Sequence, residues 1–146
     1  MGFADTMGLQ LEVVGPQRVE ATMPITPALH QSIGLLHGGA TIALLETVAS
    51  VGGEQHIDFA TQRSFGLDVH VRHRKPGKQG VVRGIAELDH EEPSYNGSLK
   101  QYWNVRAVDE EGDVVSDGVI VTKIVSLEHL AAKEEARQAA KRQVEA

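Results

Sequence analysis

The sequence predicts an α+β fold, a single domain in which an antiparallel sheet surrounds one long central helix, with a second helix at the periphery. Three observations lead to this prediction. Six segments alternate apolar with polar residues, which is typical of half-buried strands. Residues 38–52 are apolar on almost every side, as expected of a helix buried in a core. Residues 127–146 are rich in Ala, Glu, Lys, Arg and Gln, a composition that favours a solvated helix.

The first half of the chain is predicted to contain two strands and the central helix. Residues 9–14 and 19–23 alternate in hydropathy on either side of Gly15-Pro16, so we expect two antiparallel strands joined by a tight turn. Prolines end the second strand and lead into an irregular loop over 24–37. The central helix follows this loop, and Gly52-Gly53 predict its C-terminal end.

The second half of the chain is predicted to contain four antiparallel strands. They are expected at 62–73, 82–88, 99–107 and 114–125. The three connections between them are a basic turn, a longer loop over 89–98 and a turn over 109–113, all short enough for hairpins. Ser126 is a suitable N-cap for the last helix, so we divide the chain into a domain at 1–126 and a charged helix or tail at 127–146.

Composition limits the classes of function. The chain has 146 residues, enough for one domain with a sizeable core, and its net charge of -6 argues against nucleic acid as a partner. It contains no cysteine, which excludes disulfides and thiol chemistry. No apolar run is long enough to span a bilayer, and no secretory segment opens the sequence. We therefore expect a cytoplasmic protein that binds neither nucleic acid nor membrane.

One charge in the central helix needs an explanation. Glu46 lies among Ala, Ile, Leu and Val, and no basic residue stands three or four positions away to pair with it. Glu46 could be a structural carboxylate that is hydrogen-bonded to a neighbouring loop. Alternatively, a desolvated carboxylate is a good nucleophile or general base if it stays ionised.

The start of the same helix is suited to binding a carbonyl oxygen. Helix N-termini expose unpaired N–H groups, and Gly38-Gly39 would let a ligand approach the backbone closely. These glycines could instead serve close packing alone. Gly38 and Glu46 are eight residues apart, which on one helix is about 12 Å. One reacting carbon cannot contact both, so we expect a site that combines Gly38 of one chain with Glu46 of another.

A basic turn follows the third predicted strand. Its positive charges are Arg72, Arg74, Lys75 and Lys78. Such charges suit phosphate groups, although a solvated turn is the common explanation. A metal site is not expected, because His70 and His73 are three apart on a strand and point to opposite faces.

These residues resemble a known family. The segment from Gly34 to Ala40, which includes His37-Gly38-Gly39, followed by Glu46, is similar to the hotdog-fold acyl-CoA thioesterases of the PaaI-like group. The nearest branch includes 1,4-dihydroxy-2-naphthoyl-CoA, 4-hydroxybenzoyl-CoA and enterobactin-pathway thioesterases. The resemblance covers about residues 8–125. It implies hydrolysis of an acyl-CoA without metal or cofactor, in a homo-oligomer that is at least a dimer and more often a tetramer of two dimers.

The resemblance also implies roles for individual residues. Glu46 would be the catalytic carboxylate, and the Gly38 N–H would polarise the thioester carbonyl. Gln31 and His37 would orient the thioester, and Ser50 would position the water or the substrate. The substrate-binding set would be Gly39 at the helix start and, toward the nucleotide end of coenzyme A, His73, Arg74, Lys75 and Lys78.

Other functions on the same fold stay open. A non-catalytic protein that binds or senses acyl-CoA would share these features, and some relatives of this fold act as hydratases or dehydratases. The sequence leaves open the acyl group, with aryl and medium-chain groups as candidates. It also leaves open whether Glu46 acts as a nucleophile or as a general base.

Overall fold

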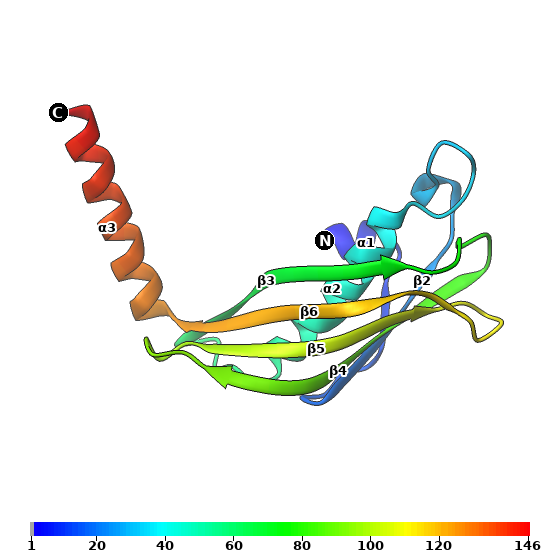
Figure 1. Ribbon diagram of the computed structural model, residues 1–146, viewed down its shortest axis with the longest axis horizontal. Helices are drawn as coiled ribbons and strands as arrows, with labels where there is room; N and C mark the ends of the chain where they lie inside the picture. Colours follow the sequence, from blue (N-terminus) through cyan, green and yellow to red (C-terminus); the bar gives the residue numbers. More distant parts are fainter. Residues whose placement is uncertain (1) are drawn as a thin grey trace.

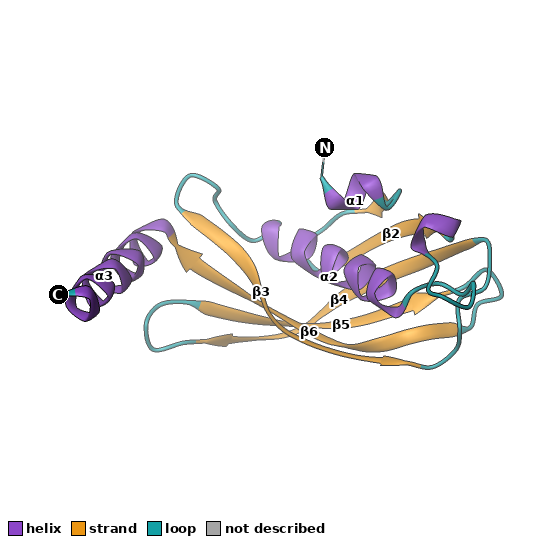
Figure 2. Ribbon diagram, turned by 90° about the horizontal axis from the view of Figure 1, so that it is seen from above, coloured by secondary structure: helices purple, strands orange, loops and turns teal. Residues whose placement is uncertain are grey.

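The computed structural model describes residues 2–146 and confirms the α+β prediction. An antiparallel sheet of six strands curves around the central helix α2, and Figures 1 and 2 show α2 lying along one face of this sheet. In chain order the elements are α1 (Phe3–Thr6), β1 (Gln10–Val13), β2 (Arg18–Pro24), the short 3-10 helix η1 (Pro27–Leu29), α2 (Gly38–Glu54), β3 (Gln62–His73), β4 (Val81–Pro93), β5 (Leu99–Val108), β6 (Val114–Ser126) and α3 (Leu127–Glu145).

The strand order corrects one of the predicted connections. The order across the sheet is β1-β2-β4-β5-β6-β3, so β3 pairs with β6 and lies at an edge. The hairpin predicted between β3 and β4 is therefore wrong, and residues 74–80 instead cross from the edge to the middle of the sheet. β4–β5 and β5–β6 are hairpins, as predicted. Local sequence gives the length of a connection, whereas the choice of partner strand depends on burial of the whole sheet face.

The central helix is held close to the sheet by glycines. The ring of Trp103 lies so close to Gly52 that a Cβ there would overlap it, and Leu44 packs in the same way against Gly84 of β4. The predicted helix end at Gly52-Gly53 is wrong, because both residues lie inside α2, which ends at Glu54. These glycines remove bulk where the helix meets the sheet and do not terminate the helix.

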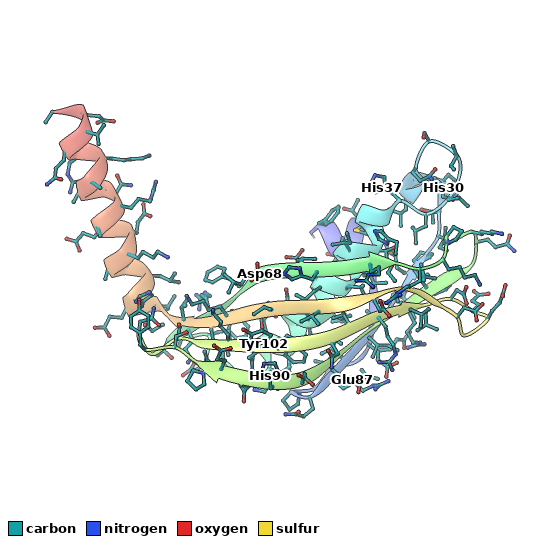
Figure 3. All side chains as sticks on the ribbon, viewed as in Figure 1. His30, His37, Asp68, Glu87, His90 and Tyr102 are labelled. Carbon is teal, nitrogen blue, oxygen red and sulfur yellow. The ribbon has the colours of Figure 1, made fainter. Side chains whose placement is uncertain are left out.

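The first half of the predicted loop over 89–98 is strand, and the turn is confined to residues 94–98. β4 continues through a bulge between Leu88 and His90 and pairs with β5 as far as Pro93. His90 stacks on Tyr102, with the ring centroids 4.2 Å apart, and the Tyr102 hydroxyl donates to Glu92. Figure 3 shows His90 and Tyr102 side by side on these strands. No alternation marks this end of the strand, because residues 89–93 are all exposed and are polar up to Pro93.

The last helix extends away from the rest of the domain (Figure 1). The Ser126 hydroxyl accepts the N–H of His129, which confirms Ser126 as the N-cap. Leu127, His129 and Leu130 in the first turn are half-buried, and α3 is exposed from residue 131 onward. Within residues 2–146, none of the helices is both long enough and apolar enough to cross a membrane.

We predict that Gly52→Ala destabilises the fold. An Ala at a helix position normally stabilises by about 0.5–1 kcal/mol, but here its Cβ would overlap the Trp103 ring. Overpacking of this kind typically costs about 1–3 kcal/mol, so the free energy of unfolding in urea should fall. Gly15→Ala is the control, because its Cβ would meet only ordinary contacts. Equal unfolding midpoints for the two variants would contradict this account of helix packing.

Candidate active site

The N-terminus of α2 leaves one backbone donor free. His37 is the N-cap, and its Nδ1 accepts the Gly39 N–H at 2.8 Å. The N–H groups of Ala40 and Thr41 both donate to the carbonyl of His37. Among the residues that the structure describes, the Gly38 N–H makes no hydrogen bond. The helix therefore presents the Gly38 N–H to a ligand, whereas that of Gly39 is already used.

The free donor lies beside a histidine from the sheet. A Cβ at Gly38 would be 2.7 Å from His73 Nε2, so only glycine fits this position without displacing the ring. His73 Nδ1 is 2.7 Å from the hydroxyl of Ser116, a fully buried residue of β6. This hydrogen bond fixes the ring at the end of β3, facing the start of α2.

The 26–37 loop completes a pocket at this place. Two backbone hydrogen bonds join the region to the 74–80 connection, from Leu36 N–H to the Gly77 carbonyl and from Ile25 N–H to the Gly80 carbonyl, each 2.8 Å long. This connection leads from the edge strand β3 to β4 in the middle of the sheet, and its hydrogen bonds hold the 26–37 loop next to the end of β3. The resulting cavity of about 350 Å³ is lined by Gln31, Leu36, Gly38, Thr41, His73 and the start of the connection.

Gln31 lies in this pocket with part of its side chain engaged. Its Oε1 accepts the Ile33 N–H at 2.5 Å, which fixes the amide group. Its NH₂ group makes no hydrogen bond to any residue in 2–146, so it can donate to a ligand. Figure 3 shows His37 at the start of α2 and His30 in the loop that precedes this helix. The His37 ring itself faces the helix start and does not line the cavity.

Glu46 lies elsewhere, against the edge strand. Its Oε1 would be 2.7 Å from a Cβ built at Gly66, and it is half-buried instead of enclosed in the core. Ser50, one turn further along α2, is also half-buried. Neither residue lines the cavity beside Gly38. The expectation that α2 is buried on all sides is therefore wrong, because the face with Glu46 and Ser50 is partly open in the single chain.

The edge strand next to Glu46 exposes several apolar side chains around its bulge. Phe65, Leu67 and Val69 are 49%, 45% and 38% exposed. β3 pairs only with β6, so the backbone groups on its other side have no strand partner in the described chain. An edge that is long, apolar and unpaired is a template for pairing with another chain.

Two of the predicted phosphate-binding cations are already paired. The Lys75 ammonium contacts Asp109 and Asp113 at 2.7 Å and Glu111 at 3.4 Å. Hydrogen bonds to Asp109 and then Asp113 raise the pKa of Lys75. Arg74 pairs with Asp117 at 3.0 Å. Lys78 makes no ion pair to a residue of the described chain. The two cations of the basic turn that line the pocket are therefore paired with carboxylates of the β5–β6 turn and of β6, which the sequence did not indicate.

Sequence reasoning missed the residues that support the site from the sheet. Ser116 positions His73, and Gly66 makes room for the Glu46 carboxylate. The only signal for Gly66 was a residue without a side chain within an alternating strand, which often marks close approach or a bulge. The register of β3 against β6 does shift between Gly66 and Asp68.

Comparison with known proteins gives a consistent picture. Residues 1–124 match the family described as a domain of unknown function, DUF4442. The 1,4-dihydroxy-2-naphthoyl-CoA hydrolase of Escherichia coli (strain K12) is 33% identical over 125 residues, which cover 86% of this chain and 85% of that protein. The proofreading thioesterase EntH of Cronobacter turicensis is 34% identical over 114 residues, covering 75% of this chain and 76% of EntH.

Solved structures share the fold over most of the chain. A glutamate-to-alanine mutant of the hypothetical protein SAV0944 from Staphylococcus aureus superposes with a TM-score of 0.80 at 27% identity, covering 86% of this chain and all (100%) of that one. Thioesterase HI1161 from Haemophilus influenzae superposes with a TM-score of 0.75 at 26% identity, covering 85% and 82%. The chain thus belongs to the DUF4442 family and is a hotdog-fold thioesterase.

Proposed function

We propose that the protein hydrolyses an acyl-CoA thioester, with an aryl or medium-chain acyl group, to a carboxylic acid and free coenzyme A. A relative at 33% identity is named as a CoA thioester hydrolase, which supports this class of substrate. Coenzyme A is then part of the substrate, and the proposed chemistry uses no metal or other cofactor. The observation that carries the proposal is the free Gly38 N–H at the start of α2, beside a cavity, on the same helix as Glu46, whose carboxylate has no ion pair with any residue in 2–146.

The Gly38 N–H is suited to polarise the thioester carbonyl. Charge develops on the carbonyl oxygen when a nucleophile attacks, and a fixed backbone donor at a helix N-terminus stabilises this charge. Loss of one such donor typically costs about 3 kcal/mol of transition-state stabilisation. Gln31 would hold the thioester with its free NH₂ group, and His37 would orient it from the helix start, where its ring already fixes the local backbone.

The carboxylate that acts on this carbonyl comes from a second chain in our proposal. Gly38 and Glu46 lie about 12 Å apart along one helix, and Glu46 is absent from the lining of the Gly38 cavity. The Glu46 carboxylate instead lies against Gly66 of the unpaired edge strand β3. Pairing of β3 with its own copy about a two-fold axis would bring two α2 helices side by side and antiparallel, so that each Glu46 approaches the other chain's Gly38.

Glu46 has two possible chemical roles in this arrangement. It could attack the thioester carbon directly and form a mixed anhydride that water then hydrolyses, or it could take a proton from the attacking water. Ser50, one turn further along the same face, would position this water or the acyl group. The dimer is the minimal active unit, and the family resemblance extends the assembly to a tetramer of two dimers.

We predict that Glu46→Gln abolishes most thioesterase activity. The amide keeps the shape of the side chain but is neither a nucleophile nor a base, so kcat should fall at least ~100-fold, the usual contribution of one catalytic base. Release of free thiol from a panel of acyl-CoA thioesters measures this rate. Glu54→Gln, an exposed residue of the same helix, is the control and should keep wild-type turnover. Near-wild-type rates for Glu46→Gln would refute the mechanism.

The same experiment separates catalysis from simple binding. If the protein only binds or senses acyl-CoA, the wild-type protein will release no thiol and will co-purify with an intact thioester. That result would replace the proposed hydrolysis by the binding function.

We predict that a charge on the β3 edge separates the chains and removes activity. Leu67→Lys places a cation on the strand that would pair with its copy, where natural edges use lysine to prevent pairing. Sedimentation velocity should show a smaller species, and turnover should fall with it. Leu11→Lys on the opposite edge strand β1, where Leu11 is 50% exposed, is the matched control and should change neither. A monomeric Leu67→Lys protein with full activity would refute the shared site.

A further inference from the structure

The last helix and the 26–37 loop extend past β3 at its two opposite ends (Figure 1). The start of α3 is fixed at one end, because the Leu127 N–H donates to the Thr61 carbonyl at 2.9 Å and Ser126 pairs with Gln62. The pocket with Gly38 and His73 lies at the other end of the strand. Beyond β3, the molecule therefore has a helix on one side and its pocket on the other.

A two-fold axis through the middle of β3 would bring these two features together. In an antiparallel pair of β3 strands, the Gln62 end of one chain lies opposite the His73 end of the other. Paired strands are about 4.8 Å apart, so α3 of one chain would begin next to the pocket of its partner. The long helix would then run along the outer side of that pocket.

The charge pattern of α3 fits an anionic neighbour. Lys133, Arg137 and Lys141 recur every fourth residue, so they lie on one face and span about 12 Å. Like charges at this spacing destabilise a helix that stands alone, and only Arg137 has an acidic partner, Glu134, within the described residues. The exposed part of α3 buries no side chain, so packing against the described chain does not stabilise it.

The pocket itself lacks free cations. Coenzyme A carries a diphosphate and a further phosphate on its ribose, yet Lys75 and Arg74 beside the pocket are already paired with carboxylates. Of the four charges of the basic turn, Arg72 and Lys78 have no ion pair in the part of the chain described, and neither of them lines this pocket. Binding a nucleotide with several negative charges there calls for cations from another source.

We propose that α3 of one chain supplies these cations to the site of the other chain, with Lys133, Arg137 and Lys141 binding the phosphates of the coenzyme A moiety. This inference rests on the proposed function and its dimer. The chain that donates Glu46 to a site then also donates the helix that holds the nucleotide. The acyl end of the substrate does not contact α3.

The test compares two thioesters with the same acyl group, one of coenzyme A and one of pantetheine, which has no phosphates. In the triple variant Lys133→Gln, Arg137→Gln and Lys141→Gln, KM for the acyl-CoA should rise about tenfold, because three exposed ion pairs of modest strength are lost. The kcat for both substrates and the KM for the pantetheine thioester should stay at wild-type values. Lys141→Gln and Arg142→Gln form a matched pair, and only the first should raise KM, since Arg142 lies outside the cationic face.

The outcomes separate this inference from the proposed function. An active, dimeric enzyme that depends on Glu46, but whose KM for acyl-CoA is unchanged in the triple variant, overturns the role of α3 and leaves hydrolysis intact. An equal rise of KM for both thioesters also overturns it, because the contacts removed by the substitutions would then not be contacts to the phosphates. If wild-type protein hydrolyses no thioester, the proposed function fails, and the role of α3 fails with it.

A mixed dimer tests which chain supplies the helix. One chain carries Glu46→Gln with a normal α3, and the other carries a normal Glu46 with the triple substitution in α3. Every active site in this dimer receives Glu46 from the chain with the altered helix. KM should therefore stay raised, as in the triple variant. A KM equal to that of the wild type would show that α3 serves the pocket of its own chain and would overturn the proposal.

Discussion

The rigidity of one helix is the constraint on which the proposed site depends. α2 carries a free backbone donor at its first residue and a carboxylate two turns later, and a straight helix keeps them about 12 Å apart. No side-chain rotation closes this distance. The chain can use both groups in one reaction only if a second copy provides one of them, so oligomerisation follows from helix geometry and adds no new element to the fold.

Close packing of α2 gives the site its precision. Gly52 admits the ring of Trp103, Gly84 admits Leu44, and Gly38 admits His73. At each of these positions the neighbouring side chain comes closer than any Cβ would allow, so the helix can neither slide nor tilt without a clash. The donor at Gly38 is thus held by contacts distributed along the whole helix. A preorganised donor of this kind needs no rearrangement during the reaction.

Sequence patterns predicted the elements better than their partners. The alternation of apolar residues gave β3, β5 and β6, and the apolar run gave α2, because burial of a local face leaves a local signal. Two predictions were wrong: the hairpin between β3 and β4, and the end of α2 at Gly52-Gly53. Both features depend on contacts between distant parts of the chain. The same holds for Ser116, which lies 43 residues from the histidine it positions. Its role has no signature in the surrounding sequence.

The basic turn illustrates how charge in a sequence differs from charge in a site. Lys75 and Arg74 suggested phosphate binding because their carboxylate partners lie about 35 to 45 residues away in the sequence. In the folded chain these cations hold the connection that carries the pocket, and releasing them for a ligand would expose several carboxylates to the same phosphates. A nucleotide would therefore gain little from displacing them. The cations of α3 do not hold any other segment of the described chain in place. An anion can therefore bind them without disrupting the pocket.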